Sequence, residues 1–243
     1  MTGLSVPKGR PPTHAAMTTP RHFISIAGLI GAGKSSLATA LGAAMHLPVY
    51  YEPVADNPYL ADFYGDMTRY AFPMQIWLLN ARFRQQQEIV WAARGAVQDR
   101  SIYEDAIFAS MLRNAGVLSQ RDLATYYALA DSMASFMKRP SMIVWLDVTP
   151  ETAYERVQAR IAAGGRDFER GIDLEYLRAL HAAYEAAMME LSRTVLILRL
   201  SYERFHDTDS MVLAICRAYE AACNVHELRV AGPDESANKA PVT

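Results

Sequence analysis

Residues 28–35 read Gly-Leu-Ile-Gly-Ala-Gly-Lys-Ser and fill every fixed position of the pattern G-x-x-x-x-G-K-S. They follow an apolar run at 23–27 (FISIA) and precede a helical pattern, so the expected order is strand, glycine loop and helix. In that arrangement, backbone N–H groups point at a polyphosphate. An ordinary glycine-rich turn is the alternative, and it is disfavoured because all fixed positions and both flanks agree. The stretch therefore predicts a binding loop for a nucleoside triphosphate.

The residue types of this loop each suit phosphate binding. Glycines allow the backbone to curl around phosphates without clashes from Cβ atoms. Lys34 can reach the β- and γ-phosphate oxygens, and the Ser35 hydroxyl can bind Mg²⁺. The expected nucleotide-binding residues of the loop are Gly28, Gly31, Ala32, Gly33, Lys34, Ser35 and Ser36.

The composition is typical of one globular α/β domain: the chain has 243 residues, of which 51% are hydrophobic and 21% charged. A formal net charge of −2 gives no reason to expect a nucleic acid partner. No apolar run approaches the roughly 18–20 residues needed to span a bilayer, so no membrane contact is expected. Cys216 and Cys223 are the only cysteines, and we expect free thiols in a reducing compartment, the cytoplasm.

The two ends of the chain lack the pattern of folded elements. Residues 1–21 are rich in proline and contain basic but no acidic residues. We expect a disordered leader there, with an organelle-targeting peptide as the less favoured alternative. Residues 231–243 are expected to form a disordered tail. Residues 22–230 contain no internal repeat and no linker, which predicts a single domain.

Hydrophobic runs alternate with helical patterns along this domain, which favours a parallel sheet with helices on both faces. Five strands are expected, at 22–28, 48–52, 96–99, 142–147 and 194–200. Helices are expected at 34–45, 71–94, 102–113, 120–137, 150–162, 172–191 and 208–224. The longest helix should begin near Pro73 and end at Gly95. In open sheets of this class, a ligand binds at the carboxyl ends of the strands.

Charged residues end two of the predicted strands. Glu52 ends the second strand and could take a proton from a hydroxyl that attacks the γ-phosphate. Asp99 and Arg100 end the third, where Asp99 could bind Mg²⁺ and Arg100 could hold both Glu52 and phosphoryl oxygens. The alternatives are a surface glutamate and a structural ion pair before a helix capped by Ser101. Because these residues lie at the ends of consecutive strands, we favour a catalytic site. We interpret Asp147, at the end of the fourth strand, as structural, because Asp99 already supplies the carboxylate for the metal.

An arginine-rich segment at about 156–171 contains a Gly-Gly pair. Arg156 and Arg160 lie about one helical turn apart, and Arg166 follows the glycines. Guanidinium groups suit the spread negative charge of a phosphoryl group during transfer. A solvated basic face is the alternative. Beside a phosphate loop, we expect a lid that closes over the nucleotide.

Together these motifs resemble those of the deoxynucleoside kinases, which phosphorylate the 5′-hydroxyl of deoxynucleosides. The resemblance covers residues 22 to about 224 and includes the phosphate loop, Glu52-Pro53-Val54, Asp99-Arg100-Ser101, Thr149-Pro150-Glu151 and the lid. Residues 50–60 (YYEPVADNPYL) are most similar to bacterial deoxyadenosine and deoxyguanosine kinases. The resemblance implies a P-loop kinase fold with a five-stranded parallel sheet, ATP and Mg²⁺. It also implies a homodimer, which we expect through helices near 102–113 and 120–137.

The resemblance also implies roles for individual residues. Glu52 would be the general base toward the 5′-hydroxyl, and Arg100 would steady it and the phosphoryl group. Tyr64 and Glu169 would hold the 3′-hydroxyl, with the Tyr64 ring leaving little room for a 2′-hydroxyl. The other implied residues are Lys34, Arg156, Arg160 and Phe205 for ATP, Gln75 for the base edge and Phe108 for the base face.

Hydrogen-bonding chemistry predicts the base preference. Gln75 and Arg82 lie seven positions apart, on one face of the long helix. Glutamine suits the N6/N7 edge of adenine and arginine the O6/N7 edge of guanine. Asp105 could fix Arg82 by a bidentate ion pair, whereas an exposed helix salt bridge is the alternative for Arg82. We expect deoxyadenosine and deoxyguanosine as substrates, with deoxycytidine as a further candidate.

Three other functions share part of this pattern. A nucleoside monophosphate kinase of the thymidylate type has the loop and the lid, but its acceptor needs no base such as Glu52. A noncatalytic nucleotide-binding subunit usually lacks the loop lysine or the base, and both are present here. A regulatory GTPase fits poorly, because no N/T-K-x-D tetrapeptide occurs.

Overall fold

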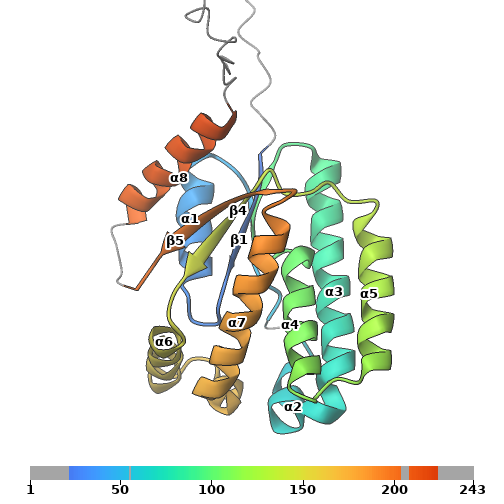
Figure 1. The fold of residues 1–243 in the computed structure, drawn as a ribbon. Coiled ribbons are helices and arrows are strands. Elements are labelled where there is room, and N and C mark those ends of the chain that lie inside the picture. Colours follow the sequence, from blue (N-terminus) through green and yellow to red (C-terminus); the bar gives the residue numbers. More distant parts are fainter. Residues whose placement is uncertain (1–21, 55, 204–207, 224–243) are drawn as a thin grey trace, which may run out of the picture.

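The computed structural model describes residues 22–54, 56–203 and 208–223. The predicted leader and tail, residues 224–230 of the predicted domain, and Phe205 lie outside these ranges. The described residues form a sheet between two layers of helices (Figure 1). None of the helices in these ranges is long and apolar enough to cross a membrane.

Five parallel strands form the sheet, in the order β2-β3-β1-β4-β5. Their bounds are Phe23–Gly28 for β1, Val49–Tyr50 for β2, Ala96–Asp99 for β3, Met142–Asp147 for β4 and Leu196–Ser201 for β5. The central strand β1 and its neighbour β3 are buried throughout, as expected for apolar strands covered on both faces. The predicted five-stranded parallel sheet is confirmed, although β2 is a short edge strand and not the full 48–52.

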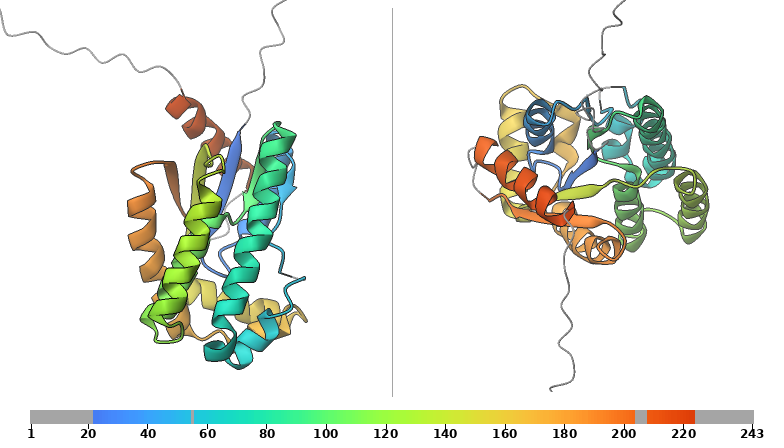
Figure 2. Two further views of the ribbon diagram at one scale, coloured as in Figure 1. Left: turned by 90° about the vertical axis from the view of Figure 1, so that its right-hand side faces the viewer. Right: turned by 90° about the horizontal axis from the view of Figure 1, so that it is seen from above.

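Helices cover both faces of the sheet, as Figure 2 shows from above. One face is covered by α1 (Lys34–Ala44) and α8 (Thr208–Cys223). The other face is covered by α3 (Met67–Ala92), α4 (Ile102–Asn114) and α7 (Leu174–Leu191), with α5 (Gln120–Ala134) outside α3 and α4. Three further elements lie near the carboxyl ends of the strands: α2 (Leu60–Gly65), α6 (Pro150–Ala162) and the 3₁₀ helix η1 (Asp167–Gly171).

The longest helix, α3, begins earlier than predicted. It starts at Met67 and not near Pro73, because the Asp66 side chain accepts a hydrogen bond from the Arg69 amide at 3.1 Å. This bond caps the helix end. Pro73 therefore lies inside α3, where burial of neighbours such as Met74 maintains the helix despite the missing N–H group.

The other end of α3 and two short elements also differ from the prediction. The helix ends at Ala92, and Ala93 adopts the left-handed conformation, with φ 52°. Gly95 also has a positive φ, of 81°, but it lies further along, directly before β3. The sequence did not predict α2 and η1, because six and five residues are too few to show helical periodicity.

The carboxyl ends of the strands meet at the end of the molecule that carries α2, α6 and η1, in the lower part of Figure 1. Apolar side chains from the sheet and both helix layers form one large core above this end. The parallel sheet therefore brings the loop after β1, the residues after β2 and the end of β3 to one edge. A ligand is expected at that edge.

Candidate active site

The loop between β1 and α1 has the conformation that its glycines permit. Gly33 immediately precedes α1 with φ 95°, and Gly31 has φ 86°. A Cβ atom on Gly31 would lie 2.6 Å from the Ala153 carbonyl oxygen of α6, so only glycine fits there. Of the loop residues predicted to bind the nucleotide, those that line a cleft are Gly31, Gly33, Lys34, Ser35 and Ser36. The other two predicted loop residues, Gly28 and Ala32, are buried behind them.

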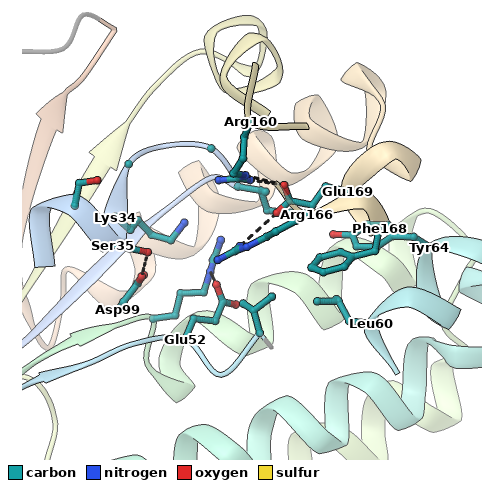
Figure 3. A pocket seen from close by; sticks show the side chains of 16 residues that line it. Lys34, Ser35, Glu52, Leu60, Tyr64, Asp99, Arg160, Arg166, Phe168 and Glu169 are labelled. Carbon is teal, nitrogen blue, oxygen red and sulfur yellow. Dashed lines mark hydrogen bonds and ion pairs between the residues drawn. The ribbon is translucent and has the colours of Figure 1, made fainter. Parts of the chain in front are cut away.

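Lys34 extends along this cleft (Figure 3). Its Nζ donates a hydrogen bond to the Leu29 carbonyl oxygen at 2.7 Å. Burial, followed by the nearby Arg100 guanidinium, lowers the pKa of Lys34 to about 8. The lysine is therefore held inside its own loop, next to the space that a phosphate would fill.

Ser35 and Asp99 join the start of α1 to the end of β3. The Ser35 hydroxyl donates to Asp99 Oδ2 at 2.5 Å. The other oxygen, Oδ1, is buried and has no hydrogen-bond partner among the described residues. Oxygen donors of this kind fit Mg²⁺. Asp147 ends β4 and pairs instead with Arg199 at 2.8 Å, which agrees with its predicted structural role.

Glu52 lies two residues beyond β2 and lines the cleft. Its Oε1 accepts from Arg82 Nη2 at 2.6 Å, and its Oε2 accepts from Arg100 Nε at 3.2 Å. Its side chain is 22% exposed, so Glu52 is not the surface glutamate of the alternative interpretation. Burial favours the neutral acid, but Arg100, Arg82, Lys34 and Arg166 together outweigh it and lower the pKa of Glu52 to about 2.

Arg100 is fixed by its backbone and by its side chain. It has φ 67°, a left-handed conformation that is uncommon for residues other than glycine and that often occurs at functional sites. Its Nη1 donates to the Tyr184 hydroxyl at 2.6 Å and to Glu104 Oε1 at 3.2 Å. The Ser101 side chain makes no hydrogen bond that caps α4, so the helix-capping interpretation gains no support.

A second, inner cavity adjoins the cleft. Its lining includes Met74, Gln75 and Arg82 of α3 and Phe108 of α4. Five residues line both the cleft and the inner cavity: Ile30, Glu52, Leu60, Tyr64 and Arg100. Glu52 therefore stands where the two spaces meet.

Two polar residues of α3, Gln75 and Arg82, face this inner cavity. Both are buried, and neither amide atom of Gln75 has a hydrogen-bond partner among the described residues. Arg82 forms ion pairs with Asp105 and with Glu52. The predicted shared face and the Asp105 ion pair are confirmed, although the pair joins one atom of each side chain and is not bidentate. The exposed salt bridge considered for Arg82 is wrong. Phe108 also lines the cavity, and the centre of its ring lies 4.8 Å from the Arg100 guanidinium carbon.

The lid residues lie over the cleft (Figure 3). Buried Glu169 of η1 accepts from Arg160 at 2.8 and 2.6 Å and from Arg166 at 3.3 Å. Tyr64 of α2 lines the same cleft, and its ring stacks on Phe168 with centroids 6.3 Å apart. The structure therefore brings Tyr64, Arg160 and Glu169 together, as the sequence predicted.

Known families can be compared with this chain by three features: a phosphate loop, a half-buried carboxylate beside it and an adjoining inner cavity. The sequence model of the family described as deoxynucleoside kinase matches residues 24–224. The chain belongs to the deoxynucleoside kinase family. It is therefore an enzyme that transfers a phosphoryl group.

Individual deoxynucleoside kinases agree with this assignment. The deoxyadenosine kinase of Dictyostelium discoideum is 48% identical over 198 residues, which cover 82% of this chain and 79% of that protein. The deoxyadenosine/deoxycytidine kinase of Bacillus subtilis (strain 168) is 35% identical over 194 residues, which cover 78% and 88%. A solved structure of deoxyadenosine kinase from M. mycoides, with products dCMP and dCDP bound, has a TM-score of 0.72 and 26% identity. That match covers 82% of this chain and 98% of the other and confirms the predicted P-loop kinase fold.

One residue predicted to contact ATP in this deoxynucleoside kinase lies elsewhere, and a second cannot be placed. Arg156 does not line the cleft, because it donates to the carbonyl oxygens of Tyr202 at 2.7 Å and of Ala32 at 3.4 Å. It thus connects α6 to the phosphate loop and to the end of β5. Phe205 lies outside the described residues.

Some residues of the kinase site gave no signal in the sequence. Tyr184 bonds Arg100 from 84 positions away, and its helical pattern predicts only a core residue. Tyr176 lines the inner cavity and Phe168 lines the cleft, and the sequence predicted neither as a site residue. Glu104 follows Arg100 by four positions, so that spacing could have predicted their ion pair.

Proposed function

We propose that this deoxynucleoside kinase transfers the γ-phosphoryl group of ATP to the 5′-hydroxyl of deoxyadenosine and deoxyguanosine, with deoxycytidine as a weaker acceptor. One observation carries the proposal: Glu52 lines both the phosphate-loop cleft and the inner cavity. A triphosphate in the cleft and a nucleobase in the cavity leave room for one sugar between them. The 5′-hydroxyl of that sugar would then face Glu52.

In the proposed reaction, the 5′-oxygen forms a bond to the γ-phosphorus while the bond to the β–γ bridging oxygen breaks and ADP leaves. Glu52 accepts the proton of the 5′-hydroxyl. Arg100 keeps its contact with Glu52 and directs its charge at the transferring phosphoryl group. Lys34 exchanges the Leu29 carbonyl oxygen for phosphate oxygens, and Arg160 adds a second positive charge from the lid.

Mg²⁺ held by Ser35 and Asp99 would supply positive charge to the phosphate oxygens. The unpartnered, buried Oδ1 of Asp99 supports this assignment. The side chain of Asp99 is shorter than that of a glutamate, so in this proposal a water molecule would lie between the Asp99 carboxylate and Mg²⁺. Phe205 remains the residue proposed to lie near the adenine of ATP.

The proposed sugar contacts come from α2 and η1. Glu169 would accept a hydrogen bond from the 3′-hydroxyl, and the Tyr64 hydroxyl would add a second contact. The Tyr64 ring is held by its stacking on Phe168, so it cannot easily move away from a 2′-hydroxyl. This rigidity supports a preference for deoxyribose over ribose.

The proposed base contacts come from α3 and α4. Gln75 offers a donor and an acceptor side by side, and both lack a partner among the described residues. These groups match the N6/N7 edge of adenine, and Arg82 matches the O6/N7 edge of guanine. Phe108 would stack on the base, while Met74 offers a more adaptable contact. The deoxyadenosine kinase of D. discoideum, 48% identical, supports a purine substrate.

We also propose that the enzyme is a cytoplasmic homodimer that acts in nucleoside salvage. A groove between α4 and α7 is lined by Tyr103, Met111 and a series of alanines that includes Ala183. Small side chains let helices of a second copy approach closely, so we place the interface on α4 and α7, not on α4 and α5. Ala183→Arg should then give a monomer in light scattering. The free thiol of Cys216 supports a reducing compartment.

Transfer of labelled phosphate from ATP tests the proposed activity. The acceptors are the four deoxynucleosides, their ribose counterparts, and the monophosphates dAMP and dTMP. We expect the fastest transfer to deoxyadenosine and deoxyguanosine, and slow transfer to adenosine. Transfer to the monophosphates alone would indicate a monophosphate kinase, and ATP binding without any transfer would indicate a noncatalytic subunit.

A further inference from the structure

Arg82 shares its guanidinium group between two carboxylates on different elements. Nη2 donates to Glu52 Oε1 at 2.6 Å, and Nη1 forms an ion pair with Asp105 Oδ1. Asp105 is 1% exposed and does not line the inner cavity, whereas Glu52 is 22% exposed and does. Asp105 therefore anchors Arg82 from behind, and the contact with Glu52 is the one that a ligand can replace.

Both oxygens of Glu52 are occupied by arginines in this structure. Arg82 holds Oε1 and Arg100 holds Oε2. Lys34 and Arg166 are the other cations that face Glu52, and all four lower its pKa. Each oxygen keeps a second lone pair, but two guanidinium groups stabilise the charged carboxylate and make it a poor proton acceptor, so release of one of these hydrogen bonds favours proton transfer from a hydroxyl group.

The inner cavity can hold a ligand that releases this bond. Gln75 and Arg82 face the same cavity, and the amide group of Gln75 has no partner among the described residues. Guanine or hypoxanthine in this cavity can present its O6 and N7 acceptors to Arg82, whereas adenine gives its N6/N7 edge to Gln75. These O6 and N7 acceptors compete with Glu52 Oε1 for the Arg82 guanidinium.

We propose that Arg82 couples binding of the nucleobase to release of Glu52. The base takes the hydrogen bond of Arg82, and Glu52 Oε1 becomes free to accept the proton of the 5′-hydroxyl, while Arg100 keeps Oε2. Arg82 is thus a positioning residue, and without a base the carboxylate stays between two arginines. This inference rests on the proposed function, in which Glu52 receives that proton.

A sugar without a base tests the coupling on the unmodified kinase. The acceptor is 1,2-dideoxy-D-ribose, which has the hydroxyl groups of deoxyribose only. At saturating MgATP and saturating sugar, we expect slow phosphorylation that free hypoxanthine accelerates about tenfold or more, the size of one hydrogen bond to a charged group. The saturated rate is the decisive quantity, because a base could improve sugar binding without any effect on Glu52.

The matched variant is Arg82→Met combined with Asp105→Leu. It replaces the buried pair as a unit and leaves no unpaired charge behind it. We expect this variant to phosphorylate the base-free sugar faster than the unmodified kinase does, with no further gain from free base. Thermal unfolding checks its fold. If the double variant does not fold, the measurement on the unmodified kinase still tests the coupling.

The coupling is overturned if free base lowers the KM for the sugar in the unmodified kinase but leaves the saturated rate unchanged. It is also overturned if free base still accelerates the folded double variant. The proposed function fails by a different result: intact deoxyadenosine is not phosphorylated, or Glu52→Gln keeps full turnover. The two failures are therefore distinguishable.

Discussion

Arg160 donates two hydrogen bonds, at 2.8 and 2.6 Å, to one oxygen atom, Oε2 of Glu169. The two residues lie on opposite sides of the Gly164-Gly165 pair, in α6 and η1, so their ion pair ties the two halves of the lid together. Arg160 is proposed to bind phosphate and Glu169 to bind the 3′-hydroxyl. The substrates therefore compete with this ion pair when they enter the cleft.

Glu169→Gln should weaken the proposed hydrogen bond to the 3′-hydroxyl of the substrate. A hydrogen bond to a charged group is replaced by a neutral one, so we expect kcat/KM for deoxyadenosine to fall about 10- to 100-fold. Steady-state kinetics with 2′,3′-dideoxyadenosine, which lacks that hydroxyl, should show a much smaller fall. Asp167→Asn is the matched control, because Asp167 lies in the same helix but is exposed and pairs with Arg170. Equal losses with both acceptors would argue against the sugar contact.

Glu52→Gln should remove the proton acceptor while leaving the carboxamide in a similar place. We expect kcat to fall about 10²- to 10⁴-fold, the usual contribution of general base catalysis. Calorimetry should show that MgATP still binds, because Glu52 is not proposed to contact ATP. Glu88→Gln, an exposed change on α3, is the control. Near-normal turnover of the Glu52 variant would show that another group takes the proton.

Asp99→Asn should change the requirement for magnesium. A neutral amide binds a divalent cation more weakly than a carboxylate, so we expect half-maximal activity to need about 10- to 100-fold more Mg²⁺. Magnesium titrations at fixed ATP measure this shift. Asp147→Asn should leave the titration unchanged, because Asp147 pairs with Arg199 outside the cleft. A shift in the Asp147 variant alone would reverse the assignment.

The pH dependence of ATP binding should report Lys34. Its pKa is about 8 in this structure, and bound phosphate must raise that pKa because it favours the charged form. Affinity for ATP should therefore be constant below about pH 8 and fall about tenfold per pH unit above it, with proton uptake on binding. Calorimetry in two buffers of different ionisation enthalpy measures both effects. The arginine in Lys34→Arg stays charged, so this variant should bind ATP with constant affinity over this range. A constant affinity of the unmodified kinase for ATP would contradict the prediction.

Tyr64→Ala should reduce the discrimination between deoxyadenosine and adenosine. In the proposed binding mode the tyrosine ring fills the space that a 2′-hydroxyl would need, and steric overpacking of this kind costs about 1–3 kcal/mol. We expect the ratio of kcat/KM values for the two nucleosides to fall by roughly tenfold or more. Tyr64→Phe keeps the ring and should keep the discrimination. If both variants discriminate like the unmodified kinase, the 2′-position is read by another residue.

Much of the site could be predicted from the chain, for specific reasons. The phosphate loop is one continuous stretch, so its function shows in eight consecutive residues. Glu52 and Asp99 could be placed because parallel strands end at the same edge of a sheet. Gln75 and Arg82 could be placed on one face because helical periodicity is regular. Each of these predictions depends on spacing within one element or on the order of elements.

Contacts between distant elements could not be predicted in this way. Arg82 was expected to pair with Asp105 and to bond a guanine edge, yet it also bonds Glu52, which lies 30 positions earlier. Arg156 was expected at the nucleotide but bonds the loop at Ala32 and the end of β5 instead. Short elements such as α2 and η1 were missed, although they supply Tyr64 and Glu169.

The sequence by itself determined the class of fold, the phosphate loop and the kinds of chemical group available, because these depend on local conformation and on periodic burial. Only the tertiary structure decided which charges meet. Glu52 is held by two arginines, and Glu169 by two others, because α3, β3, α6 and η1 converge at one end of the sheet. An ion pair forms wherever packing brings opposite charges together, and packing distances are not encoded in the spacing of residues along the chain.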